Sequence, residues 1–154
     1  MPTEEHYRRL EGMYLSAPVN AYYTPTLHIT EGHAEVTVAV RRDFFHAAGA
    51  VHGAVYFKLL DDAAFFAANS LVEDVFLLTV SFNIYLTRPV SEGEIKSVGH
   101  VVFRSRRLFV AEAVLFDSAG REIGRGSGTF MRSEIALSGV PGYGTTIGER
   151  GSDV

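Results

Sequence analysis

The sequence predicts an α+β fold in which one long central helix is wrapped by an antiparallel β-sheet. Residues 53–71 are expected to be helical and are apolar on nearly every side, which indicates a helix enclosed by protein. Strand-like segments then follow one another without a further helix, an order typical of antiparallel sheets. The chain has 154 residues, of which 47% are hydrophobic, and this suffices for one globular domain with a single core.

The elements expected before the long helix begin with an amphipathic helix. Thr3 is its predicted N-cap, and Glu4 and Glu5 favour the positive end of its dipole. A proline-containing loop and a hairpin turning at Gly32 should follow. The predicted ranges are a helix at 3–15, a loop at 17–24 and strands at 26–31 and 34–40.

The segment after the long helix alternates in polarity and predicts a half-buried strand over residues 76–87. Its apolar face would carry Val80, Phe82, Ile84 and Leu86. Three more strands are expected at 94–103, 108–116 and 122–131. Residues 1–136 would then form the single domain. Residues 137–154, which contain five glycines and little apolar material, are expected to be a flexible tail.

Composition excludes several classes of function. The formal net charge of -4 does not favour a nucleic-acid partner, which calls for a basic surface. There is no cysteine, so disulfides, cysteine–zinc sites and cysteine nucleophiles are excluded. His6, His28, His33 and His100 lack ligand spacing, and no metal site is expected. The charged start of the chain does not resemble a secretion signal, and no apolar run is long enough to span a membrane, so we expect a cytoplasmic protein.

Two carboxylates stand out in the middle of the apolar helix, Asp61 and Asp62. A buried charge without a partner is costly, so at least one of them is expected to line a cavity. An aspartate in such a helix, downstream of the His52-Gly53 pair, indicates a catalytic site. The competing interpretation is that both aspartates are structural.

The residues around this helix resemble the hotdog-fold acyl-CoA thioesterases of the phenylacetate-pathway (PaaI)/THEM2-like group. The resemblance covers about residues 34–132 and includes the segment HAAGAVHGAVYFKLLDDAAF and the later strand TVSFNIYLTRPV. The group's pattern is Asn, two residues, Gly, two residues, His-Gly-Gly, and then an Asp eight residues after the first of those two glycines. The matching positions here are His46, Gly49, His52, Gly53, Ala54 and Asp61.

The resemblance implies a hotdog fold, homodimers or dimers of dimers, and hydrolysis of an acyl-CoA thioester at composite sites across the dimer interface. It implies no added cofactor, because coenzyme A is part of the substrate. A hotdog hydratase would carry an Asp and a His about five residues apart before the helix, and that pair is not found. A non-catalytic acyl-CoA-binding hotdog protein or ligand sensor stays open as the alternative. A sensor would also need a DNA-binding element, for which this chain has no room.

The chemistry of Gly53 and Asp61 can also be argued from the residues. A glycine at a helix start offers an unpaired N–H that can polarise a thioester carbonyl and hold its oxyanion, although Gly53 could equally serve only a tight turn. Asp61 can attack the thioester or activate a water, and the sequence does not choose between these. Eight helical residues separate the two by about 12 Å, so one carbonyl can reach both only if they come from different subunits.

Four other residues are candidates near this chemistry. Asp62 lies about 100° around the helix from Asp61 and is its rival. His46, where the family usually has Asn, could position a water, act as an auxiliary base, or signal altered activity. His52 is expected to brace the turn by hydrogen bonding rather than to transfer a proton. Thr79 could hydrogen-bond the water or the thioester, or could be an ordinary strand residue.

The expected coenzyme A contacts are basic or polar. Arginines bind phosphates in bidentate fashion, and three arginines lie close together in one predicted hairpin turn. A turn that merely faces solvent could have the same composition. Aromatic residues could wall a tunnel for an acyl or aryl group or simply form core. The candidates for coenzyme A are Arg104, Arg106, Arg107, Ser81 and Arg88, and those for the tunnel are Phe44, Phe45, Phe65, Phe66 and Phe82.

Overall fold

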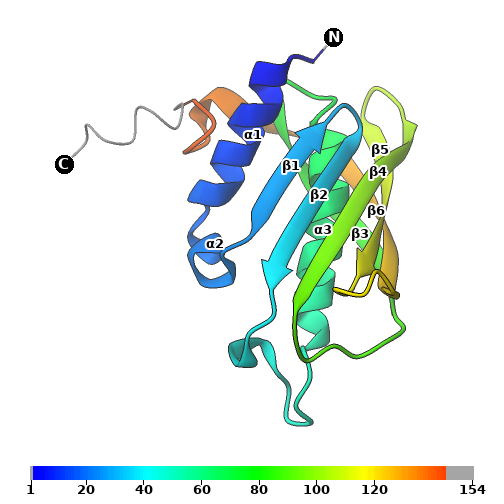
Figure 1. Ribbon diagram of the computed structural model, residues 1–154. Coiled ribbons are helices and arrows are strands. Elements are labelled where there is room, and N and C mark those ends of the chain that lie inside the picture. Colours follow the sequence, from blue (N-terminus) through cyan, green and yellow to red (C-terminus); the bar gives the residue numbers. More distant parts are fainter. Residues whose placement is uncertain (1, 145–154) are drawn as a thin grey trace, which may run out of the picture.

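A six-stranded antiparallel sheet curves around one long helix in the computed structural model, which describes residues 2–144 (Figure 1). The strand order is β1-β2-β4-β5-β6-β3, and every neighbouring pair is antiparallel. This confirms the predicted α+β arrangement of a central helix and an antiparallel sheet. The helix is α3 (Gly53–Asn69), and the strands are β1 (Thr26–Thr30), β2 (His33–Ala39), β3 (Val75–Leu86), β4 (Glu94–Arg104), β5 (Leu108–Phe116) and β6 (Glu122–Ala136).

Helix α3 is buried because it crosses the inner face of the sheet at close range. Leu59, Leu60 and Ala63 have no exposed surface. The close approach depends on Gly99 in β4, where a Cβ would lie 2.4 Å from the carbonyl of Ala63. None of the helices in the described part of the chain is long and apolar enough to cross a membrane.

Helix α1 (Glu4–Ser16) begins as the sequence predicts, since the Thr3 side chain accepts a hydrogen bond from the His6 N–H. The loop predicted for residues 17–24 is wrong, because these residues form a second short helix, α2 (Pro18–Tyr23). Pro18 occupies its first turn, where the missing N–H removes no hydrogen bond. Both helices cover the same side of α3 (Figure 1).

The predicted flexible tail begins too early. Strand β6 continues to Ala136, a short 3-10 turn follows at Leu137–Gly139, and Leu137 has no exposed surface. The chain then returns to α1, where Tyr143 is buried. We call residues 137–144 the strap. Apolar anchors at Leu137 and Tyr143 hold it despite its glycines, and the rest of the expected tail lies outside the described residues.

Strand β3 forms one edge of the sheet and pairs only with β6. The sequence predicted that Val80, Phe82, Ile84 and Leu86 form a buried face of this strand, and in the single chain only two of the four are partly buried. Phe82 and Ile84 are half-buried, but Val80 and Leu86 are 57% and 50% exposed. A register shift between Thr79 and Ser81 interrupts the alternation, as a β-bulge does.

Candidate active site

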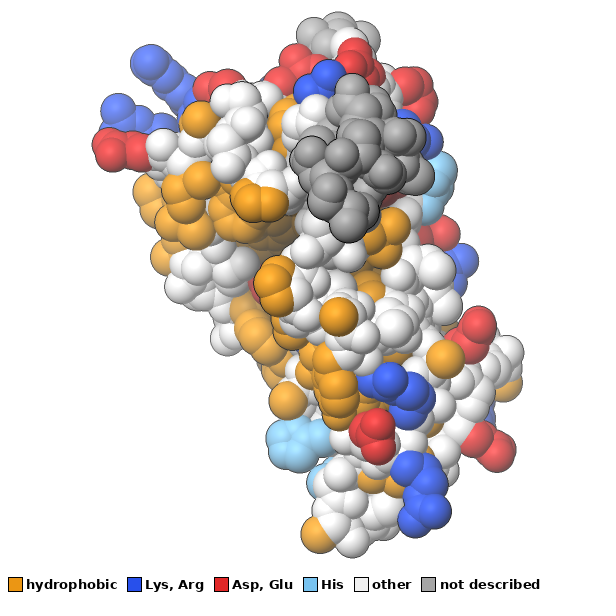
Figure 2. Space-filling view, turned by 90° about the vertical axis from the view of Figure 1, so that its left-hand side faces the viewer, with side chains coloured by type: hydrophobic (Ala, Val, Ile, Leu, Met, Phe, Trp, Pro, Cys, Tyr) orange, Lys and Arg blue, Asp and Glu red, His pale blue; other side chains and the backbone are white. Residues whose placement is uncertain are grey.

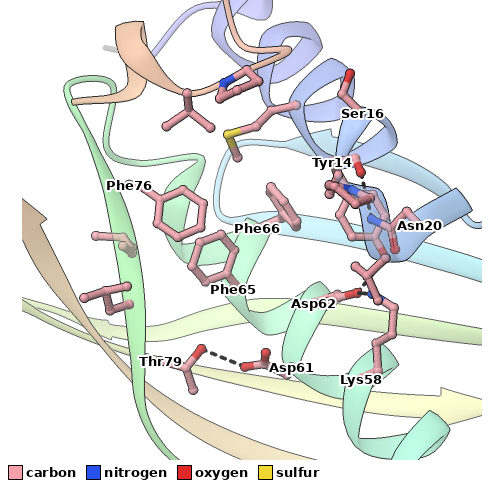
Figure 3. Close-up of a pocket in the computed structure, with 18 residues that line it drawn as sticks. Tyr14, Ser16, Asn20, Lys58, Asp61, Asp62, Phe65, Phe66, Phe76 and Thr79 are labelled. Carbon is pink, nitrogen blue, oxygen red and sulfur yellow. Dashed lines mark hydrogen bonds and ion pairs between the residues drawn. The ribbon is translucent and has the colours of Figure 1, made fainter. Parts of the chain in front are cut away.

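A pocket with a volume of ≈ 470 Å³ lies between α3, β3, the two N-terminal helices and the strap. On the side of the molecule drawn in Figure 2, hydrophobic side chains surround a hollow. The pocket is mainly apolar; Lys58, Asp61 and Asp62 reach it from α3, and Thr79 of β3 lies across from Asp61 (Figure 3). Its polar members are Tyr14, Ser16, Asn20, Lys58, Asp61, Asp62 and Thr79, and its apolar members are Met13, Ala17, Pro18, Val19, Phe65, Phe66, Phe76, Leu77, Leu78, Val140 and Pro141.

Asp61 reaches the pocket from α3 and meets Thr79 from β3. The Thr79 hydroxyl donates a hydrogen bond of 2.9 Å to Asp61 Oδ1 (Figure 3). Within residues 2–144, Asp61 Oδ2 has no hydrogen-bond partner. The carboxylate is therefore held by one oxygen while the other remains available.

The pKa of Asp61 is raised to about 6. Burial is the main cause, and the nearby Asp62 adds to it, whereas the Thr79 hydrogen bond and the charge of Lys58 act in the opposite direction. A carboxyl group that titrates near neutrality suits a general base, because it is a stronger base than an ordinary aspartate yet is ionised above pH 6.

Asp62 is engaged by partners on the other side of the helix. Lys58, one turn earlier, forms an ion pair of 2.7 Å with Asp62 Oδ2, and the Tyr14 hydroxyl donates to the same oxygen at 2.6 Å. The Lys58 and Asp62 side chains are only 15% and 17% exposed. Burial raises the pKa of Asp62, but the neighbouring Lys58 opposes this. The pairing gives Asp62 a structural role that ties α1 to α3.

The N-terminus of α3 holds the two histidines of the motif. His52 is the N-cap, and its Nδ1 accepts the N–H of Ala54 at 2.9 Å. His46 makes the same kind of contact, since its Nδ1 accepts the N–H of Ala48 at 3.0 Å. In the neutral form, both rings therefore carry their proton on Nε2. His52 thus hydrogen-bonds within the turn at the start of α3, and the outer nitrogen of a neutral His46 is a donor.

Gly53 opens α3, and its N–H takes no part in the capping hydrogen bonds, which use Ala54 and Val55. A side chain here would meet Leu86, because a Cβ would lie 2.8 Å from its Cδ1. Gly53 lines a second, smaller hollow of ≈ 310 Å³ together with His46 and Arg88. In the single chain, Gly53 and Asp61 thus border two different hollows.

The remaining predicted ligand contacts are dispersed. Arg104, Arg106 and Arg107 are exposed around the β4–β5 hairpin, and none of them lines the pocket of Asp61. Ser81 is exposed on β3 beside the bulge, and it does not line that pocket either. Of the predicted tunnel aromatics, only Phe65 and Phe66 line it.

The structure brings residues to the pocket that the sequence does not single out. Lys58 could have been found, because it stands four residues before Asp62 on a helix, the spacing of an ion pair. Tyr14 and the strap residues Val140 and Pro141 gave no such signal, because only the tertiary fold brings them to α3. Within the described residues, no three His, Asp or Glu side chains are grouped as a metal site requires.

The fold and one segment of the sequence resemble those of known proteins. A profile of the thioesterase superfamily matches residues 48–123, which include Gly53, Asp61 and Thr79. Over this segment the chain is thus similar to the thioesterase superfamily, and its fold is the hotdog fold of solved thioesterase-family structures. A comparison with curated proteins found no match.

Three solved structures illustrate the likeness. The PaaI protein of the Escherichia coli phenylacetic acid degradation operon gives a TM-score of 0.80 at 17% identity, covering 88% of this chain and 99% of that one. A thioesterase family protein from Silicibacter pomeroyi gives a TM-score of 0.76 at 26% identity, covering 82% and 96%. A variant of the phenylacetic acid degradation protein PaaI from Thermus thermophilus gives a TM-score of 0.69 at 24% identity, covering 76% and 100%.

Proposed function

We propose that this protein is an acyl-CoA thioesterase, which hydrolyses an acyl- or aryl-CoA thioester to the free acid and coenzyme A. The observation that carries the proposal is the state of Asp61. It is a largely buried carboxylate with a raised pKa, it borders an apolar pocket, and only Thr79 hydrogen-bonds it within the described residues. Its neighbour Asp62 is neutralised by Lys58, so Asp61 is the acid left for chemistry.

Two routes fit this carboxylate. As a base, Asp61 takes a proton from a water whose oxygen attacks the thioester carbonyl carbon. As a nucleophile, Asp61 attacks that carbon itself and forms an anhydride, which water then hydrolyses. In both routes the C–S bond breaks, coenzyme A leaves as a thiolate that takes up a proton, and the carbonyl oxygen carries negative charge in the transition state.

The oxyanion donor would come from a second copy of the chain. Along α3, Gly53 and Asp61 are separated by eight residues, a rise of about 12 Å, so the two cannot serve one carbonyl within one chain. A homodimer with antiparallel α3 helices would place the unpaired Gly53 N–H of one copy opposite Asp61 of the other. The sheet edge at β3 favours such a pairing, because Leu78, Val80 and Tyr85 are exposed along it.

Coenzyme A would lie outside the apolar pocket, at the basic surfaces. Arg88 stands next to the Gly53 hollow and would face a ligand whose carbonyl binds there. Arg104, Arg106 and Arg107 are exposed and free to bind phosphate oxygens. His46 would donate through Nε2 toward the same hollow, in the place where the family usually has an amide donor.

Thiol release from a panel of aryl- and fatty acyl-CoAs, comparing the wild type with Asp61→Asn, tests the proposal. We expect turnover of at least one ester and its loss by about three orders of magnitude or more in the variant. Asp74→Asn is the matched control, because Asp74 is an exposed acid paired with Arg132. Asp61→Asn should keep the oligomer size of the wild type, and its melting temperature at neutral pH should be slightly higher.

Two outcomes would contradict the thioesterase proposal. If Asp61→Asn retained wild-type turnover, Asp61 would not be the acid. If the wild type bound acyl-CoA tightly but hydrolysed none, the protein would be an acyl-CoA binder. His46→Asn would then show whether the histidine is the reason.

A further inference from the structure

The walls of the pocket come from two different parts of the chain. Asp61 and Thr79 lie inside the segment that matches the thioesterase superfamily, residues 48–123. The facing wall comes from the two ends of the described chain, which lie outside that segment. It consists of Met13, Tyr14, Ser16, Ala17, Pro18, Val19 and Asn20 from α1–α2 and Val140 and Pro141 from the strap.

The strap is fixed in place by contacts at both of its ends. At its start, Leu137 is fully buried and its N–H donates to the Asp74 carbonyl at 3.0 Å. Near its end, the Tyr143 hydroxyl lies 2.8 Å from His6 Nδ1, and the other ring nitrogen of His6 lies 2.9 Å from the Asn69 carbonyl at the end of α3. Val140 and Pro141 lie between these two anchors.

The strap also fits closely onto α1. Gly142 has a φ of +91°, and a Cβ there would lie 2.7 Å from the Ser16 hydroxyl oxygen and 3.0 Å from the Gly12 carbonyl. A glycine is therefore required both for the backbone conformation and for the close approach. Such a contact is a specific packing of this segment against α1, and it lies next to Val140 and Pro141, which line the pocket.

The N-terminal part of the wall is anchored to the helix that carries the acid. The Tyr14 hydroxyl donates to Asp62 at 2.6 Å, next to Asp61 in the sequence. The Asn20 side-chain N–H in turn donates to the Tyr14 carbonyl at 2.7 Å, which joins α2 to α1. Both wall segments are thus connected to α3 and form a rigid boundary for the pocket.

We propose that the strap and helices α1–α2 select the acyl group, whereas the segment that matches the superfamily, residues 48–123, supplies the chemistry. This inference rests on the proposed thioesterase function and concerns the same pocket. The selected acyl group is apolar and uncharged, because Lys58, the only cationic side chain that residues 2–144 contribute to the pocket, is already paired with Asp62. A packed apolar wall discriminates by size, at roughly 10- to 200-fold per methylene in a tight pocket.

Substitutions on the wall test the proposed selection of the acyl group and leave Asp61, Thr79 and Gly53 unchanged. Val140→Trp on the strap and Val19→Trp on α2 would reduce the room in the pocket. We expect each to lower kcat/KM for the largest acyl group that the wild type hydrolyses by about tenfold or more, with less than about a twofold change for the smallest. Val140→Ala should shift the preferred acyl group to a larger one. Ser138→Trp is the matched control, because Ser138 is exposed on the same strap and does not line the pocket.

A second pair of variants tests the anchor of the strap. Tyr143→Phe keeps the ring but removes the hydroxyl that contacts His6, so the strap should loosen and the size selectivity should broaden. Tyr22→Phe is the control, because its hydroxyl donates to the Asp43 carbonyl at 3.0 Å, at an exposed site outside the pocket. Melting temperatures of all variants report whether they fold.

The outcomes separate this inference from the proposed function. Unchanged ratios of kcat/KM across the acyl series in folded Val140→Trp and Val19→Trp would overturn it while leaving the thioesterase proposal intact. If the wild type hydrolysed no ester, the thioesterase proposal would fail by itself. Calorimetry would then measure the affinity of the wild type and of Val140→Trp for the same acyl-CoA series. A change in which acyl group binds most tightly would support the selective wall, and an unchanged order of affinities would overturn it.

Discussion

The Thr79 hydroxyl donates a 2.9 Å hydrogen bond to Asp61 Oδ1, joining the edge strand β3 to the middle of α3 at the pocket. The two residues are 18 positions apart in the chain. The bond stabilises the ionised carboxylate and therefore lowers its pKa against the larger effect of burial. It also fixes which carboxylate oxygen is occupied and which can meet water or substrate.

Thr79→Val should remove this hydrogen bond while keeping the shape of the side chain. We expect kcat/KM to fall by about tenfold, because the carboxylate loses its orientation. The pH at which activity reaches half of its maximum should rise, because the bond that lowers the pKa of Asp61 is gone. Thr79→Ser should restore both values, and a pH–rate profile with no shift in Thr79→Val would show that the hydroxyl has no part in tuning the acid.

The wild-type pH profile should follow the ionisation of Asp61. Because its pKa is raised to about 6, activity should increase as the pH rises through about 6 and then level off. An ordinary, exposed aspartate would instead give a rise near pH 4. A profile of kcat/KM from pH 4 to 9 measures this, and a midpoint near 4 would show that Asp61 is not desolvated as the structure indicates.

Asp61→Asn should stabilise the fold at neutral pH. The native state holds the Asp61 proton to a higher pH than the unfolded chain does, so the native state loses stability as the pH rises from about 4 to about 6. Removing the carboxyl avoids this cost, which we place at about 1 kcal/mol after allowing for partial solvent exposure, or about 2–4 °C in Tm. The gain should be present at pH 8 and disappear near pH 4 in melting curves recorded at one protein concentration.

Lys58→Met should destabilise the protein. Among the described residues it leaves the carboxylate of Asp62 with only the Tyr14 hydroxyl as a partner, at a site where both members of the ion pair are largely buried. We expect a loss of about 2 kcal/mol in the free energy of unfolding, since an unpaired buried charge is costly. The double variant Lys58→Met/Asp62→Leu should recover most of it in urea titrations, and equal losses in both variants would refute a pairing role.

Gly99→Ala should be strongly destabilising. Its Cβ would lie 2.4 Å from backbone atoms of Ala63, so α3 or β4 must shift, at a cost of about 3 kcal/mol or more. Gly139→Ala is the control, because a Cβ there meets nothing within 4 Å and its φ is not positive. Similar melting temperatures for the two variants would mean that the helix and the sheet are not in close contact at this point.

The sequence by itself predicted the elements whose patterns are local. The apolar run of α3 and the cap at Thr3 each depend on neighbouring residues, and both appear in the structure. The spacing from His52 to Asp61 marked the motif for the same reason, since a helix converts spacing directly into distance. The sequence predicts a loop in place of α2 because Pro18 is a common turn signal, although a proline also fits the first turn of a helix.

Only the tertiary structure decided which aspartate is free. Asp61 and Asp62 are adjacent and chemically equal in the sequence, and their difference comes from Thr79 on one side and from Lys58 and Tyr14 on the other. Tyr14 is 48 residues away from Asp62, and the strap reaches the pocket from beyond residue 136. Burial and long-range partners set a carboxyl's charge state and the shape of a pocket, and neither is encoded in the spacing of nearby residues.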